Sequence, residues 1–214
     1  YTFMHNKQKY NIGPKYLKMP TAEFSTGDFM RLVGKRIPLE EFEERAAMLG
    51  TSVEEVDEEK IVVEVFPNRP DMLSVEGFAR AYRTFTGLEK GLKEYKVEKS
   101  DIVLKVDSSV KKVRPHIVSA IVKNLPMNEE TLLSIISIQE SLHGSHGRRR
   151  SKVAIGIHDF DKTSPNYSYT TSKPKETRFT PLDFSEEMDL DEILQKHPKG
   201  QDYKHILEGT KEYP

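Results

Sequence analysis

Residues 148–162 read RRRSKVAIGIHDFDK, and the rest of the chain can be interpreted outward from this stretch. Three arginines and Lys152 directly precede an apolar run at 153–157, which has the length of a short buried strand. His158 and Asp159 follow at the point where that strand would end. A buried strand that carries an ionisable pair to its tip can form the scaffold of a functional site. A core strand with a solvated charged flank fits the same residues, so both interpretations stay open.

The residues around this stretch predict further elements of both kinds. A helix is expected from Met127 to Gly144, and its apolar residues are frequent enough to predict that it is largely buried. Alternating and apolar runs predict strands at 102–106 and 117–122 before that helix, weaker strands at 167–171 and 176–179 after it, and short helices at 189–196 and 202–207.

The first part of the chain predicts a separate set of elements. Strands are expected at 21–24, 51–56 and 61–65, and helices at 26–33, 39–49 and 75–85. Residues 88–100 are polar and rich in lysine, as is typical of a linker. We therefore expect an α+β protein with a basic N-terminal extension at 1–18, a small N-terminal α/β domain at 19–95, and the first part of a mixed α/β domain at 96–214.

The segment FPNRPD at 66–71 predicts a rigid loop, because its two prolines fix the backbone and remove two hydrogen-bond donors. The loop presents Asn68, Arg69 and Asp71 on a stiff frame. Arg69 and Asp71 can form a local ion pair that holds the turn, or they can face a partner.

The composition excludes several classes of function. The chain has 33 basic and 34 acidic residues, with a formal net charge of −1, so any contact with nucleic acid must come from a local patch. It has no cysteine, which excludes disulfides and thiolate metal sites. No apolar run reaches the roughly 20 residues that span a bilayer, and no signal-peptide core is present, so we expect no membrane contact and a cytoplasmic location.

The chain contains none of the common catalytic motifs. It has no phosphate-binding glycine loop, no dinucleotide fingerprint and no paired-histidine metalloprotease motif. The candidates for metal ligation are His143, His146 and His158 with Asp159, but their spacing matches no closed tetrahedral site. We therefore predict no metal site.

Three stretches together resemble a known family. NRPDMLSVEGFARAYRTFTG at 68–87, RPHIVSAIVKNL at 114–125 and RRRSKVAIGIHDFDK at 148–162 are similar, in this order, to the beta subunit of phenylalanyl-tRNA synthetase in its archaeal and eukaryotic-cytosolic form. The similarity continues from Tyr167 through TRFTPL at 177–182 to Pro214. Met19 matches the usual start of the family, so residues 1–18 depart from its pattern.

The resemblance implies an enzyme that attaches phenylalanine to its tRNA with ATP and magnesium, built from two alpha and two beta chains. It places the aminoacylation site on the alpha subunit, and an editing domain that hydrolyses mischarged tyrosyl-tRNA in the beta subunit from about residue 100. This portion is expected to bind no cofactor itself and to hold an incomplete editing pocket.

The resemblance also suggests roles for individual residues. His158 and Asp159 match the family's pair after the strand and are the candidates for editing chemistry. The basic residues Arg148, Arg149, Arg150 and Lys152 are the candidates for contacts with tRNA. Asn68, Arg69 and Asp71 match a loop that we interpret as structural. The alternatives are a free-standing tRNA-binding or trans-editing module and a non-catalytic interaction subunit.

Overall fold

The computed structural model describes residues 20–214, so the predicted basic extension at 1–18 lies outside the described residues. The chain divides into two compact units, and the boundary between Lys90 and Gly91 falls within the expected polar linker. Both units combine helices with small sheets, which confirms the predicted mixed fold class. The structure describes no helix that is long and apolar enough to cross a membrane.

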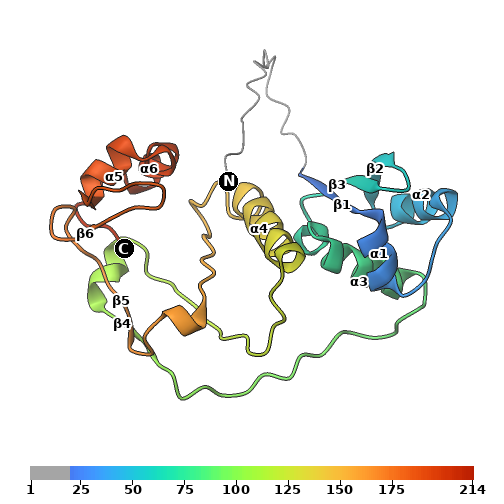
Figure 1. Ribbon diagram of the computed structural model, residues 1–214, viewed down its shortest axis with the longest axis horizontal. Helices are drawn as coiled ribbons and strands as arrows, with labels where there is room; N and C mark the ends of the chain where they lie inside the picture. Colours follow the sequence, from blue (N-terminus) through green and yellow to red (C-terminus); the bar gives the residue numbers. More distant parts are fainter. Residues whose placement is uncertain (1–19) are drawn as a thin grey trace, which may run out of the picture. The chain divides into compact units, whose positions relative to one another are not determined.

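The first unit places three helices beside one small antiparallel sheet (Figure 1). The sheet has the strand order β1-β3-β2, with β3 in the centre. Its elements are β1 (Thr21–Ser25), α1 (Thr26–Val33), α2 (Leu39–Met48), β2 (Thr51–Val56), β3 (Lys60–Val65), the short 3-10 helix η1 (Pro70–Met72) and α3 (Val75–Phe85). These elements confirm the strands and helices predicted for this part of the chain.

Local side chains set the ends of these elements. The Ser25 hydroxyl accepts a hydrogen bond from the backbone N–H of Asp28 and so caps α1, and Gly34, with a φ of 79°, ends that helix. The Asp57 carboxylate accepts the N–H groups of Glu59 and Lys60 at 2.8 and 2.7 Å, which closes the hairpin between β2 and β3. These backbone hydrogen bonds lower the pKa of Asp57.

An aromatic cluster forms the centre of the first unit. The rings of Phe29 and Phe42 meet edge to face with their centroids 5.0 Å apart, and Phe29 meets Tyr82 in the same way at 5.3 Å. Phe24 and Phe78 complete the cluster. The cluster joins residues from β1, α1, α2 and α3, so it holds these three α-helices against the sheet.

The proline-rich loop packs closely on α3. Arg69 donates two hydrogen bonds to the carboxylate of Asp71, at 2.9 and 2.8 Å, in a bidentate ion pair. This ion pair raises the pKa of Arg69 and lowers that of Asp71. A side chain at Gly77 would overlap the carbonyl oxygen of Asp71, so only glycine allows α3 to approach the loop this closely.

The second unit contains one long helix and several short elements. They are β4 (Leu104–Val106), η2 (Ser108–Lys112), α4 (Glu129–Gly144), η3 (Phe160–Lys162), β5 (Tyr167–Tyr169), β6 (Arg178–Phe179), β7 (Met188–Asp189), α5 (Leu190–Lys196), α6 (Pro198–Tyr203) and η4 (Lys204–Leu207). β4 pairs in parallel with β5, and β6 pairs antiparallel with β7. The long helix is confirmed, and its first turn is capped by the side chain of Asn128, which accepts from the N–H of Thr131.

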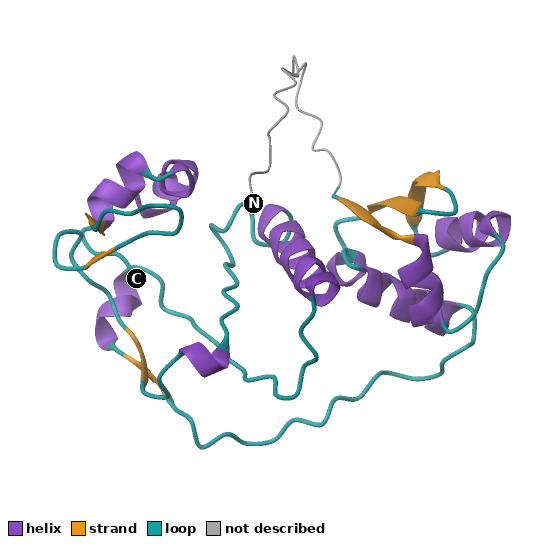
Figure 2. Cartoon of the chain, in the orientation of Figure 1, coloured by secondary structure: helices purple, strands orange, loops and turns teal. Residues whose placement is uncertain are grey.

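Two strand predictions in this unit are wrong. Residues 153–157 and 117–122 form no strand, and the chain that follows α4 is drawn as loop in Figure 2. A strand needs a neighbour that pairs with its backbone groups. In residues 20–214 no other strand pairs with either run, and Val118 and Val122 remain 96% and 72% exposed.

The prediction that α4 is largely buried is also wrong. Within the described residues, Leu132, Leu133 and Ile136 are 47%, 58% and 47% exposed. His143 is the one residue of this helix that is fully buried. The apolar residues of the helix identify a face that could be buried, but no described layer covers that face.

Candidate functional site

The basic stretch forms a left-handed turn directly after α4. Arg148, Arg149 and Arg150 have φ values of 49°, 52° and 65°. Residues with side chains rarely adopt this region, and each such residue costs on the order of 1 kcal/mol or more. Three such residues in succession therefore require surrounding contacts that hold the turn in place.

Backbone and glycine packing fix the turn. The N–H of Gly147 donates to the carbonyl of Leu142 at 2.7 Å, and the N–H of Lys152 donates to the carbonyl of Gly147 at 2.9 Å. A Cβ added at Gly147 would lie 2.6 Å from the carbonyl oxygen of Val153 and 3.0 Å from those of Leu142 and His143. The turn therefore requires glycine at position 147.

Arg150 connects three parts of the second unit. Its guanidinium donates to the Glu140 carboxylate at 2.6 Å and lies over the ring of Tyr203, 4.4 Å from the centroid. Its backbone carbonyl accepts a hydrogen bond from Arg114 at 2.8 Å. The Tyr169 hydroxyl in turn donates to the Arg114 carbonyl at 2.9 Å. The turn is thus tied to α4, α6 and β5.

Glu140 is charged at neutral pH in this arrangement. Burial opposes its ionisation, but the charge of Arg150 and hydrogen bonds from His143 and Arg150 outweigh burial and lower the pKa of Glu140. The Nδ1 atom of His143 lies 3.3 Å from the same carboxylate. A carboxylate only accepts, so we assign the imidazole proton to Nδ1.

Two side chains of α4 hold the peptide groups of Ile155, in the middle of the expected strand. The N–H of Ile155 donates to Nε2 of His143 at 2.7 Å, and its carbonyl accepts from the side-chain amide of Gln139 at 2.7 Å. These bonds satisfy the two polar groups that a neighbouring strand would otherwise satisfy. His143 is thereby a packing and hydrogen-bonding residue.

The other predicted cations lie at the surface. Arg148, Arg149 and Lys152 are exposed, and the structure shows no ion pair between their side chains and another described residue. Their three positive charges are therefore presented to solvent on a turn whose backbone is held in place. Among the four predicted tRNA contacts, Arg150 alone uses its guanidinium inside the unit.

His158 and Asp159 are not brought together into a pair. Both side chains are exposed, and no hydrogen bond or ion pair joins them. Asp159 instead accepts from the N–H of Asp161 at 3.1 Å and caps η3, while a Cβ on Gly156 would lie 3.1 Å from Nε2 of His158. In the described chain no three histidine, aspartate or glutamate residues lie close enough to bind a metal ion.

Comparison with known proteins identifies close relatives over most of the chain, although no family model matches it. The phenylalanine–tRNA ligase beta subunit of Methanothrix thermoacetophila is 43% identical over 197 residues, which is 92% of this chain. Those of Archaeoglobus fulgidus and Pyrococcus furiosus are 44% and 42% identical over the same share of the chain. The chain belongs to the phenylalanine–tRNA ligase beta-subunit family.

Within this beta-subunit family, the chain matches the N-terminal part. It spans 36% of the length of the Methanothrix thermoacetophila protein. The solved structure of an N-terminal fragment of the phenylalanyl-tRNA synthetase beta-subunit from Pyrococcus horikoshii superposes with a TM-score of 0.84 at 38% identity, covering 91% of this chain and 57% of that one. The fold and the family are therefore established together.

Sequence reasoning did not identify the polar partners of this beta-subunit site. Gln139 and Glu140 lie four and three residues before His143, so each shares a face of α4 with His143, which a helical periodicity search for polar residues would have found. Tyr203 gave no local signal, because it meets Arg150 from a helix 53 positions further along the sequence.

Proposed function

We propose that this chain forms the N-terminal part of the beta subunit of a phenylalanine–tRNA ligase, an enzyme that charges tRNA with phenylalanine using ATP and magnesium. The synthetic site would lie on the alpha subunit, and two alpha and two beta chains would form the enzyme. The identity of 43% over 92% of the chain carries this proposal. ATP and magnesium would bind outside this chain, and a cytoplasmic location stays a prediction.

The second unit would begin a domain that hydrolyses tyrosine wrongly attached to the tRNA. Tyrosine is phenylalanine with one added hydroxyl, and a mainly apolar pocket rejects an added hydroxyl only weakly, so a second hydrolytic step improves accuracy. His158 and Asp159 are the residues proposed to act there, with the histidine orienting water or stabilising the oxyanion. Both side chains are exposed and accessible to a substrate, and Asp159 also caps η3.

The left-handed turn would contact the tRNA backbone. Arg148, Arg149 and Lys152 present their charges to solvent, and phosphate groups are the natural partners of such cations. Arg150 would contribute mainly by holding the turn, since its guanidinium is already bound to Glu140 and Tyr203.

Editing is tested by measuring hydrolysis of tRNA for phenylalanine that carries tyrosine, with phenylalanyl-tRNA as the control. The 214-residue chain is compared with the complete beta subunit. We expect the complete subunit to be active and the shorter chain to be inactive, because the pocket is proposed to need residues beyond Pro214. Loss of activity in His158→Ala of the complete subunit would support its role. Inactivity of both proteins would contradict the editing proposal.

Contact with tRNA is tested with the double variant Arg148→Ala/Arg149→Ala. Each lost phosphate contact removes about 0.7–0.9 from the slope of log affinity against log salt, so the slope should fall by about 1.4–1.8. Lys111→Ala/Lys112→Ala is the matched control, since it removes two exposed cations from η2. Equal slopes for the two double variants would contradict the proposed contact.

A further inference from the structure

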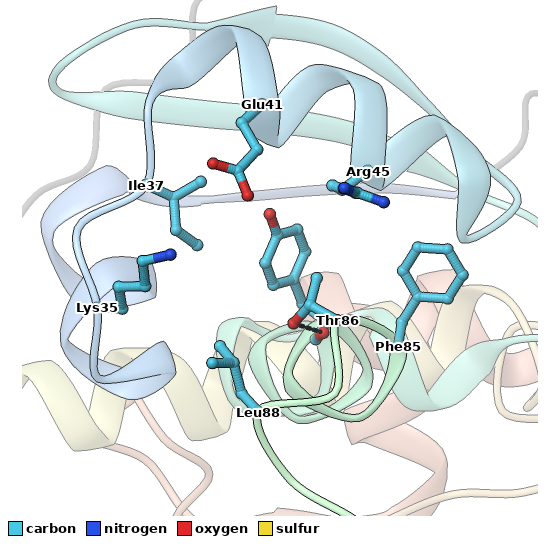
Figure 3. Close-up of a pocket in the computed structure, with 8 residues that line it drawn as sticks. Lys35, Ile37, Glu41, Arg45, Phe85, Thr86 and Leu88 are labelled. Carbon is cyan, nitrogen blue, oxygen red and sulfur yellow. Dashed lines mark hydrogen bonds between the residues drawn. The ribbon is translucent and has the colours of Figure 1, made fainter.

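Two buried rings in residues 20–214 carry polar atoms, and these two rings are held in different ways. In the first unit, Tyr82 is 1% exposed and lines a small pocket between α2 and the end of α3 (Figure 3), and its hydroxyl has no hydrogen-bond partner among the described residues. In the second unit, His143 is 2% exposed, and both of its ring nitrogens have partners. Aromatic packing accounts for the Tyr82 ring, whereas the His143 ring is matched to two polar groups.

The two partners of His143 require a neutral imidazole with its proton on Nδ1. That nitrogen lies 3.3 Å from the carboxylate of Glu140, and Nε2 accepts the N–H of Ile155 at 2.7 Å. An N–H can donate to Nε2 only while Nε2 carries no proton. Burial of an imidazole costs free energy unless its nitrogens are hydrogen-bonded, and a leucine would fill a similar volume without that cost. Packing alone therefore does not explain a histidine at this position.

The bond from Ile155 is one half of a clamp formed by two side chains of α4. The side-chain amide of Gln139 donates to the carbonyl of Ile155 at 2.7 Å, so both backbone polar groups of this residue are held by one helix. In residues 20–214 no strand pairs with the segment 153–157. The clamp of Gln139 and His143 is therefore what fixes this segment to α4.

The clamp lies directly before His158, one of the two residues proposed for editing. Asp159, on the other side of His158, accepts from the N–H of Asp161 at 3.1 Å and is thereby fixed to η3. A Cβ on Gly156 would lie 3.1 Å from Nε2 of His158, so the His158 ring lies against the backbone at that glycine. His158 is thus flanked by two held positions, and its ring follows the backbone that the clamp fixes.

We propose that the clamp positions His158 for the hydrolysis of tyrosyl-tRNA, an inference that rests on the proposed editing function. In this reaction water adds to the ester carbonyl, the bond to the ribose oxygen breaks, and a proton of the water passes to that oxygen, which releases tyrosine and tRNA. Gln139 and His143 are positioning residues, because they act only through the backbone of Ile155. Catalytic groups need such supporting hydrogen bonds, since a displacement of about 1 Å can cost about 100-fold in rate.

The test measures hydrolysis of tyrosyl-tRNA by the complete enzyme. His143→Leu removes the bond to Ile155 and should lower kcat by up to about 100-fold, with little change in KM, because the proposed tRNA contacts lie on the turn at 148–152. Gln139→Leu removes the other half of the clamp and should lower kcat in the same direction. His146→Leu is the matched control, since it makes the same change at an exposed histidine of the same region. Its kcat should equal that of the unmodified enzyme.

A rescue variant separates positioning from a purely structural role. His143→Gln places a side-chain oxygen near the position of Nε2, so it keeps an acceptor for the N–H of Ile155 and should restore most of kcat. Hydrogen exchange of the Ile155 amide should be faster in His143→Leu and slow again in His143→Gln. A purely structural role would lower the melting temperature of His143→Leu but leave kcat per folded enzyme unchanged.

The outcomes distinguish this inference from the function on which it rests. Unchanged kcat in folded His143→Leu and Gln139→Leu, beside an active unmodified enzyme, would overturn the clamp and leave editing in place. If His143→Leu does not fold, Gln139→Leu decides alone, because Gln139 is only partly buried. If the unmodified complete enzyme does not hydrolyse tyrosyl-tRNA, the proposed editing function fails, and the role of the clamp fails with it.

Discussion

The two units of this chain are ordered by different means. Among residues 20–214, all the buried hydrophobic residues except Val110 and Met188 lie in the first unit. The second unit is tied together by polar contacts, such as those of Arg150 with Glu140 and of His143 with Ile155. Apolar burial contributes about 25 cal/mol per Å², whereas one internal hydrogen bond contributes about 1 kcal/mol net. The comparison shows that core packing stabilises the first unit and local polar contacts shape the second.

The largest expected effect tests this contrast directly. Phe29 is fully buried at the centre of the aromatic cluster, and Leu133 on α4 is 58% exposed. Phe29→Ala should lower the free energy of unfolding of the first unit by about 3–5 kcal/mol, because it leaves a cavity. Leu133→Ala should change the free energy of unfolding of the second unit by about 0.5 kcal/mol or less. Calorimetry of both variants measures the two effects.

The same experiment can contradict this difference between the two units. A loss of more than about 2 kcal/mol in Leu133→Ala would mean that α4 is buried in solution. The second unit would then have an apolar core of its own, and its polar contacts would be secondary.

The second prediction concerns the turn after α4. Gly147→Ala should destabilise the second unit by about 1–3 kcal/mol, because its methyl group would collide with the carbonyl oxygen of Val153 at 2.6 Å and crowd two others at 3.0 Å. Gly144→Ala is the matched control, since a Cβ there meets nothing within 4 Å. Hydrogen exchange of the amides of Gly147 and Lys152 reports the opening of this turn. Equal exchange in both variants would show that the turn is not held by close packing.

The sequence predicted the first unit far better than the second. In the first unit, capping residues such as Ser25 and Ser74 and the periodicity of apolar residues determine helices and strands locally. The apolar faces that this periodicity predicts are buried against other elements of the same unit. At 153–157 the apolar pattern predicted a buried strand, but Val153 and Ile157 are 37% and 54% exposed, because strand formation depends on a distant neighbour that the pattern does not encode. The contacts of the site were not predicted for a similar reason, since Arg150 and Tyr203 are far apart in sequence and meet only in the folded chain.

The third prediction compares the contributions of Arg150 and Arg149 to stability. Arg150→Ala should lower the stability of the second unit by about 1 kcal/mol, through loss of its ion pair and its contact with the Tyr203 ring. Arg149→Ala should leave stability unchanged, because its side chain is exposed and forms no ion pair with another described residue. Urea unfolding of both variants provides the measurement. A greater loss in Arg149→Ala would reverse the assigned roles.

The smallest effect concerns pH, and it occurs in both units. In the second unit, Glu192 accepts from Lys196 and from the N–H of Asp189 at the start of α5, and these bonds lower its pKa to about 2 from 4.5. A carboxylate whose pKa is lowered in the folded state stabilises the fold at any pH above its ordinary pKa. This stabilisation is lost as the pH falls from 4.5 through about 2. Asp57, whose pKa is also lowered, gives the first unit a change of the same sign.

Carboxyl NMR titration should place the Glu192 midpoint near 2, and Lys196→Ala should raise it. An unmoved midpoint in that variant would mean that Lys196 adds little to the N–H of Asp189 and the guanidinium of Arg178, which also donate to Glu192, so that the acid response of the second unit does not depend on the Lys196 pair.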